Sequence, residues 1–308
     1  MIRNQTKKPQ KKMRAITKIL LCSLFTLLSI FNVYGQSTDS VQTINKKRLR
    51  TFIGVSAATY TLSLVGLNEL WYRDSQKQAF HFFNDNAEWK QVDKLGHFYS
   101  AFYLSYGTSG ALSWCGVNQR KADLWGSLTG FLIMLPIEVF DGYSEDYGAS
   151  SGDLVANAAG AGFYLGQKLF WKEIRIQPKF SYHKTGYPSF RPDDALGDTF
   201  ASELLKDYNG QTYWLSFDMD KFIKFPKWLN LTIGYGADEM VYARDGSNEA
   251  AGYQAYWQYY IGLDFDLTGI KTRSKFLKTF FAIASAIKLP APTLEFSSEG
   301  TKFHAFYF

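Results

Sequence analysis

Three pairs of polar side chains have the types and the spacing that acid–base chemistry or metal binding requires. The pairs are Asp93 with His97, Glu138 with Asp141, and Asp153 with Asn157. Their members are three or four positions apart, so on a helix both side chains of a pair would share one face. Such pairs could carry a catalytic or a metal-binding site.

The expected chemistry follows from the residue types. His97 would transfer a proton and Asp93 would orient its ring. The carboxylates expected to hold a metal ion are Glu138, Asp141 and Asp153. Because most of these ligand atoms are hard oxygens, Mg²⁺, Ca²⁺ or Mn²⁺ is expected rather than a structural zinc ion. Lys94 and Asn157 would complete the polar patch.

A structural role is the alternative for the same residues. Asp93 and Asp153 could cap helices, which stabilises a helix by about 1 kcal/mol. Glu138 and Asp141 fit this alternative less well, because carboxylates near the C-terminal end of a helix oppose its dipole at about 0.3–1 kcal/mol each. They require a cation nearby, either protonated His97, Lys94 or a metal ion.

Four predicted helices must position these residues. They span residues 51–71, 93–113, 122–140 (which Pro136 would kink or end) and 153–171. At about 1.5 Å per residue each is roughly 30 Å long, which suits a four-helix bundle or a membrane crossing. Short connections make neighbouring helices antiparallel, so the three polar pairs should meet at one end of the bundle.

The ordered motifs resemble a known family. The motifs are Asp93-Lys94-Leu95-Gly96-His97-Phe98, then Glu138-Val139-Phe140-Asp141-Gly142, then Ser151-Gly152-Asp153 with Asn157 and Gly160. Over about residues 50–173 they resemble the YfiM-like family of uncharacterised bacterial envelope proteins, and more distantly the VanZ-like family. The segment 80–86 and the tail 206–214 look like the Bacteroidetes-type branch of the first family. The resemblance implies an envelope location and no established reaction.

The N-terminus predicts export. Residues 1–35 contain seven basic residues and no acidic one, and after the last basic residue an apolar run extends from Ile19 to Val33. This pattern describes a signal peptide cleaved after Gly35, with an uncleaved membrane anchor as the alternative. Without them the net charge changes from +6 to −1, and no basic stripe remains to support nucleic-acid binding. Cys22 lies inside the apolar run, so a lipid anchor at the cleavage point is not expected. Cys115, the other cysteine, has no partner for a disulfide.

Charge also bears on the location. Loop 141–152 contains three acidic residues and no basic one, whereas basic residues gather near positions 46–50 and 120–121. With the mature chain outside the cytoplasm, that distribution opposes the positive-inside tendency of inner-membrane proteins. We therefore expect the periplasm or the outer membrane rather than the inner membrane.

Residues 174–308 show the period-two alternation of strands. The expected strands span 175–183, 214–220, 229–236, 259–267, 294–297 and 302–308, and residues 198–206 and 275–288 look helical. The terminal Phe308 is typical of outer-membrane strands, although six strands are fewer than the eight of the smallest barrels. A soluble sheet with one buried face is the alternative.

The predicted fold is therefore α+β. A signal peptide (1–35) precedes an N-terminal four-helix bundle (36–173), membrane-associated or periplasmic, and an antiparallel β-rich region (174–308). The favoured function is an envelope protein with a structural or partner-binding role, whose partner is a membrane lipid or an envelope component. The alternative is a metal-dependent enzyme acting on a lipid or cell-wall headgroup.

Overall fold

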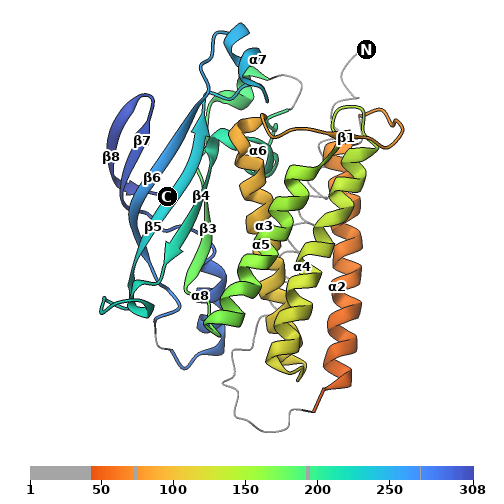
Figure 1. Ribbon diagram of the computed structural model, residues 1–308, viewed down its shortest axis with the longest axis vertical. Helices are drawn as coiled ribbons and strands as arrows, with labels where there is room; N and C mark the ends of the chain where they lie inside the picture. Colours follow the sequence, from red (N-terminus) through yellow and green to blue (C-terminus); the bar gives the residue numbers. More distant parts are fainter. Residues whose placement is uncertain (1–42, 73–74, 192–194, 271) are drawn as a thin grey trace, which may run out of the picture.

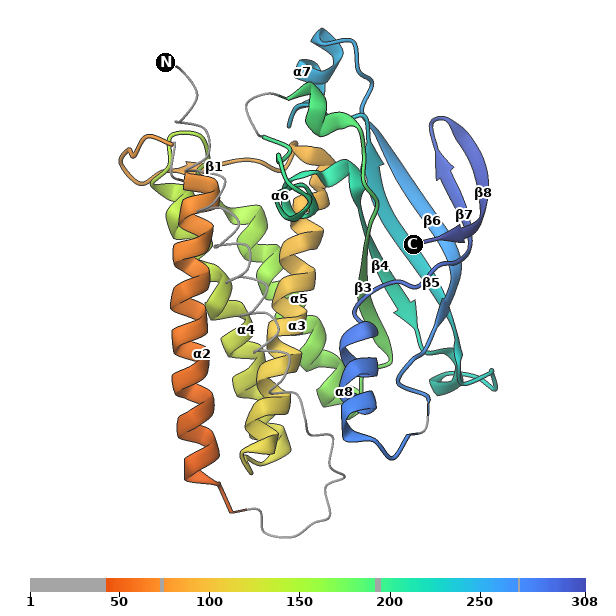
Figure 2. The same ribbon diagram turned by 180° about the vertical axis from the view of Figure 1, so that it is seen from behind.

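The computed structural model describes residues 43–72, 75–191, 195–270 and 272–308, and shows a helical layer beside a sheet (Figure 1). The predicted signal peptide lies outside the described residues. Figure 2 shows from behind that the sheet faces α3 and α5, while α2 lies at the far side of the helical layer. The mixed helix-and-sheet class predicted from the sequence is confirmed.

The four long helices lie close to their predicted bounds. They are α2 (Lys46–Leu67, continued by a π-helical turn, Asn68–Tyr72), α3 (Val92–Trp114), α4 (Gln119–Gly142) and α5 (Ser151–Phe170). Pro136 lies inside α4 and does not end it.

The helical core consists of three helices rather than four. Gly160 of α5 lies so close to α3 that an added Cβ would be 2.1 Å from the carbonyl oxygen of Phe98. At Gly130 of α4, a Cβ would be 2.1 Å from Ser105 Oγ of α3. By contrast, α2 buries only Thr59 and Gly66 among its described side chains. A packed four-helix bundle is thus not confirmed, since α2 lies alongside a core of α3, α4 and α5.

The C-terminal half forms one antiparallel sheet in the order β3-β4-β5-β6-β7-β8. Its strands are β3 (Ile176–Tyr182), β4 (Gln211–Phe217), β5 (Leu229–Asp238), β6 (Tyr256–Phe265), β7 (Ala291–Ser297) and β8 (Gly300–Tyr307). Three short helices connect them, α6 (Phe200–Lys206), α7 (Asp245–Ala250) and α8 (Lys275–Ala284). All six predicted strands are present, and consecutive strands pair, as expected for a meander.

The sheet has an unusual distribution of polarity. On one face, which we call the outer face, Ile233, Ile261, Leu294 and Phe303 pair across β5 to β8 and are exposed. The other face, the inner face, buries polar side chains. There Lys179 Nζ lies 2.5 Å from Asp264 Oδ2, and both side chains are almost fully buried. In a sheet with one face in water, the apolar face is the one expected to be buried.

Aromatic side chains join the helical layer to the sheet. The ring of Tyr99 on α3 packs 6.0 Å from the rings of both Phe180 and Tyr213, which lie on the outer face of β3 and β4. The Tyr103 hydroxyl donates a 2.7 Å hydrogen bond to the carbonyl of Pro178. This contact covers the outer face at β3 and β4, and Val92 packs against Tyr235 and Ala237 at one end of β5. The apolar row across β5 to β8 stays exposed.

Candidate functional site

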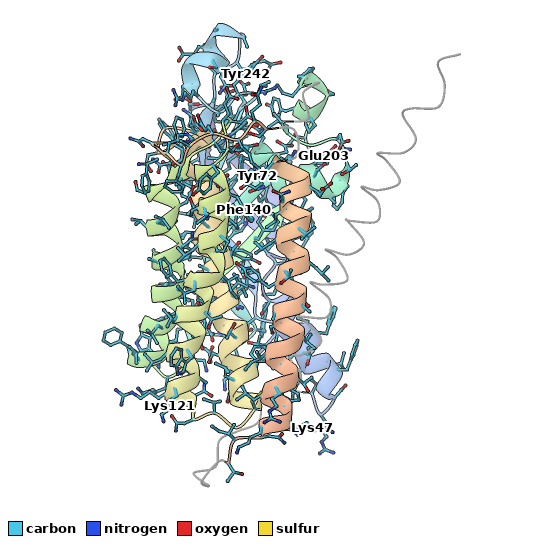
Figure 3. The ribbon with its side chains drawn as sticks, turned by 90° about the vertical axis from the view of Figure 1, so that its right-hand side faces the viewer. Lys47, Tyr72, Lys121, Phe140, Glu203 and Tyr242 are labelled. Atoms are coloured by element: carbon cyan, nitrogen blue, oxygen red, sulfur yellow. The ribbon has the colours of Figure 1, made fainter. Side chains whose placement is uncertain are left out.

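A polar cluster lies at one end of the helical layer, as the helix directions predicted. We use this name for Asp85, Asp93, Lys94, His97, Glu138, Asp141, Ser150, Asp153 and Asn157. These residues come from the start of α3, the end of α4, the start of α5 and the segment that follows the short strand β1 (Phe82–Phe83). In Figure 3, Tyr72 and Phe140 mark this end, and Lys47 and Lys121 mark the opposite, basic end.

Lys94 forms ion pairs with three carboxylates in one half of the polar cluster. Its ammonium lies 2.6 Å from Asp85 Oδ2, 2.9 Å from Asp93 Oδ2 and 2.8 Å from Asp153 Oδ1. Burial alone would lower the pKa of Lys94, but these carboxylates raise it above its ordinary value. The lysine therefore stays charged, and its ion pairs link α3 to the start of α5 and to the segment that carries Asp85.

Local pairing brings Asp85 to the polar cluster. Strand β1 pairs in parallel with β2 (Ala149–Ser150), which directly precedes α5. Ser150 Oγ then donates a 2.5 Å hydrogen bond to Asp85 Oδ1 and accepts one of 3.1 Å from the backbone N–H of Asp153. One serine thus caps α5 and fixes the loop that carries Asp85.

His97 lies in the other half of the polar cluster. Its Nδ1 is 3.1 Å from Asn157 Oδ1 and 3.7 Å from Glu138 Oε1, and its Nε2 is 3.9 Å from Asp153 Oδ1. One ligand atom each from His97, Glu138 and Asp153 lies within 4.8 Å of the others. Burial lowers the pKa of His97, which favours the neutral imidazole.

Glu138 and Asp141 differ in their surroundings, although both are near the end of α4. Glu138 is buried and accepts a 3.2 Å hydrogen bond from the backbone N–H of Ser150 at Oε2, but no described residue donates to its Oε1. Asp141 accepts a 2.7 Å hydrogen bond from the hydroxyl of Tyr72. Asp141 is not one of the three residues whose ligand atoms converge.

The carboxyl groups outnumber the cations. Burial, with the nearby Asp153 carboxylate, raises the pKa of Glu138 to about 8. Burial likewise raises the pKa of Asp141 to about 7 and that of Asp93 to about 6. Five carboxyl groups face one lysine, so a bound cation or protons must balance part of the charge.

The structure brings together most of the residues selected from the sequence, but in other partnerships. Asp93 contacts Lys94, and it is Asn157, not Asp93, that hydrogen-bonds His97. Sequence reasoning missed Asp85 and Tyr72. The polar run Asn84-Asp85-Asn86 before the first motif was the available signal for Asp85, whereas no sequence signal pointed to Tyr72.

The described side chains of the polar cluster that form ion pairs are largely buried, with exposures of 4–19%.

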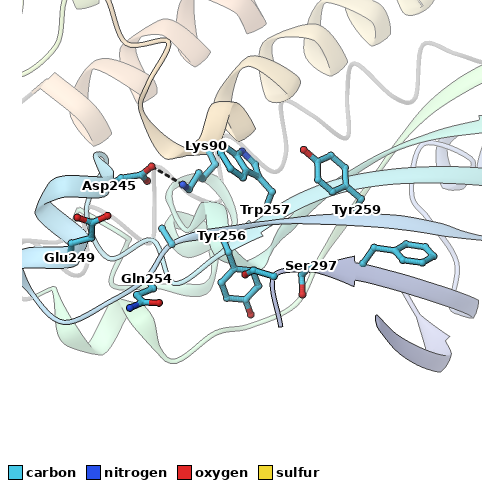
Figure 4. Close-up of a pocket in the computed structure, with 11 residues that line it drawn as sticks. Lys90, Asp245, Glu249, Gln254, Tyr256, Trp257, Tyr259 and Ser297 are labelled. Carbon is cyan, nitrogen blue, oxygen red and sulfur yellow. Dashed lines mark hydrogen bonds and ion pairs between the residues drawn. The ribbon is translucent and has the colours of Figure 1, made fainter. Parts of the chain in front are cut away.

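A separate pocket of about 690 Å³ lies near α7 and β6, where Lys90 Nζ is 2.7 Å from Asp245 and 4.2 Å from the ring centroid of Trp257 (Figure 4). This pocket contains none of the polar-cluster residues.

The comparisons with known proteins concern the same part of the chain. The chain shows no significant match to a curated protein or to a solved structure. The location predicted from the signal peptide is confirmed by a family match: this is an exported protein of the periplasm or the outer membrane. Residues 80–167, which include the whole polar cluster, match a family described as "Predicted periplasmic lipoprotein (DUF2279)".

Proposed function

We propose that this protein has a structural role at the outer membrane, where the outer face of its sheet binds the lipid. The observation that carries the proposal is the reversed polarity of the sheet. The four residues paired across β5 to β8 are 46%, 55%, 40% and 68% exposed, in the order Ile233, Ile261, Leu294 and Phe303. They form a continuous apolar row.

The polar interior of the sheet supports a lipid partner. Beyond the pair of Lys179 and Asp264, the inner face contains a hydrogen bond of 2.7 Å from Ser216 to Asp264. Apolar residues facing out and polar residues facing in are the pattern of strands that contact membrane hydrocarbon. Apolar surface left in water costs about 25 cal/mol per Å², so a covered outer face is strongly favoured.

The helical layer adds apolar surface of its own. Leu124, Leu128 and Leu132 are four positions apart on α4 and are all exposed. Among the described residues, α4 alone is both long and apolar enough to cross a membrane, judged by length and composition. The amphipathic helix α8 exposes Phe276 and Phe280. These surfaces would extend the contact with lipid.

The polar cluster would serve this role by holding the helices in place. Its side chains are buried and contact one another, which suits a structural function better than a catalytic one. The resemblance to the YfiM-like and VanZ-like families implies the same envelope location. A metal-dependent enzyme acting on a lipid or cell-wall headgroup remains the alternative, and it requires the cluster to open toward solvent.

Vesicle flotation tests the proposal. The chain from residue 36, reconstituted with vesicles of phosphatidylethanolamine and phosphatidylglycerol, is expected to float with the lipid. Ile261→Asp places a charge in the apolar row and should weaken vesicle binding about tenfold, since loss of one buried aliphatic side chain costs about 1.5 kcal/mol or more.

Leu205→Asp is the matched control, because Leu205 is similarly exposed but lies on α6, outside the outer face. This variant should bind vesicles like the wild type. Circular dichroism establishes that both variants are folded. Absence of wild-type flotation, or equal losses in the two folded variants, would refute the proposal.

A further inference from the structure

The half of the polar cluster around His97 has the chemistry of a metal site. His97, Glu138 and Asp153 come from three different helices, α3, α4 and α5. Each offers one ligand atom within 4.8 Å of the other two. Ligand atoms bonded to one ion at about 2.2 Å are about 3.1–3.6 Å apart at ordinary coordination angles, so the three side chains would need to approach one another by about 1 Å.

An unpartnered acceptor points into this space. Glu138 has a side chain that is 4% exposed, and its Oε1 accepts no hydrogen bond from any described residue. His97 Nδ1 lies 3.7 Å from this oxygen, which is beyond hydrogen-bond distance. A buried carboxylate oxygen without a partner is costly, and a bound cation would remove that cost.

Neighbouring polar groups orient the candidate ligands through hydrogen bonds, as the groups around the ligands of a metal site commonly do. With its proton on Nδ1, His97 donates to Asn157 Oδ1 and keeps the lone pair of Nε2 for a ligand bond on the side of Asp153. Ser150 fixes Glu138 through its backbone N–H. Asn157 is fully buried, so its position is set by packing.

Lys94 does not replace this cation. It lies among Asp85, Asp93 and Asp153, and no contact within 4.0 Å joins it to Glu138 among the described ion pairs. We infer that His97, Glu138 and Asp153 bind one divalent cation, and that Mn²⁺ fits this set best. Two carboxylates suit the hard ions Mg²⁺, Ca²⁺ and Mn²⁺, and of these Mn²⁺ is the one that best tolerates an imidazole ligand.

The site would join the three helices of the core. The His97 side chain is about one-fifth exposed, so the cation would lie close to the molecular surface. The inference is independent of lipid binding, because it concerns the polar cluster and not the outer face of the sheet.

Electron paramagnetic resonance of Mn²⁺ tests the inference directly, since the signal of the free ion falls when it binds. We expect the metal-stripped chain from residue 36, in detergent, to bind one Mn²⁺ per molecule and to melt at a higher temperature with Mn²⁺ than without it. Glu138→Gln removes a ligand charge at nearly constant shape and should weaken Mn²⁺ binding at least tenfold.

Glu145→Gln is the matched control, because Glu145 is an exposed acid in the loop between α4 and α5. It should bind Mn²⁺ like the wild type. No stoichiometric Mn²⁺ binding by the wild type would overturn the inference, whether or not Glu138→Gln folds. Equal affinities in the two glutamine variants would also overturn it.

Discussion

At the residue scale, the sequence identified which groups gather but not how they pair. Helical spacing places Asp93 and His97 on one face, and antiparallel helices bring both near Asp153, so the polar cluster was predictable. The identity of each partner depends on side-chain directions and on the segment before α3, which has no helical or strand period. For that reason Asp85 was missed, although it lies 2.6 Å from Lys94.

Lys288 offers a residue-scale prediction outside the polar cluster. It lies in the segment between α8 and β7, and its buried ammonium is 5.1 Å from the ring centroid of Trp214 and donates a 2.9 Å hydrogen bond to the carbonyl of Leu289. Burial lowers the pKa of Lys288 to about 8, with nearby Lys179 adding to the shift and Asp264 opposing it. The unfolded chain has the ordinary value near 10.5.

Between these two pKa values the unfolded state binds more protons, so the free energy of unfolding should rise as the pH rises from about 8 to about 10.5. Lys288→Met should lack this rise, which is worth about 3 kcal/mol. Urea unfolding of both proteins at pH 7.5, 9 and 10.5 measures the difference. If the free energy of unfolding changes with pH in the same way in both proteins, Lys288 does not have the lowered pKa that this prediction requires.

At the element scale, the periods of the sequence predicted four long helices and all six strands. Helix α7 was not predicted, because its six residues are too few to show a period. The packing of α2 also could not be predicted. Its length suits a bundle, but its apolar residues Ile53 and Val65 remain exposed, so length did not determine which helices form the core.

The contact of α3 with α5 depends on Gly160. An alanine Cβ at this position would meet backbone atoms of Phe98, so Gly160→Ala should force the helices apart and lower the free energy of unfolding by about 1–3 kcal/mol. Gly162→Ala is the control on the same helix, since a Cβ there meets nothing within 4 Å.

Gly162→Ala should be neutral or stabilising by up to about 1 kcal/mol, because alanine favours the helix. Chemical denaturation of the two variants gives both values. If Gly160→Ala is as stable as Gly162→Ala, the close approach of the helices does not depend on this glycine.

At the scale of the whole molecule, the reversed polarity of the sheet is the feature that the sequence could not reveal. Alternation of period two divides a strand into two faces but does not say which face is inside. Leu231 and Ile233 alternate with Asn230 and Thr232, and the structure buries the polar pair. The structure therefore shows that the apolar face of these strands is the exposed one, and the membrane-binding hypothesis depends on this observation.

The basic end of the helical layer and the polar cluster lie at opposite ends (Figure 3). The mature chain, nearly neutral overall, thus holds a buried acidic cluster at one end of this layer and exposed basic residues at the other.

The depth of the outer face in the bilayer tests the central claim most directly. Cys115 is buried, so a cysteine introduced at Ile261 can be labelled selectively with an environment-sensitive fluorophore in the chain from residue 36. We predict that lipids carrying a nitroxide on their acyl chains quench this fluorophore strongly. The same fluorophore on a cysteine that replaces Lys206, on α6, should be unaffected. Equal and weak quenching at both positions would contradict contact between the outer face and the hydrocarbon.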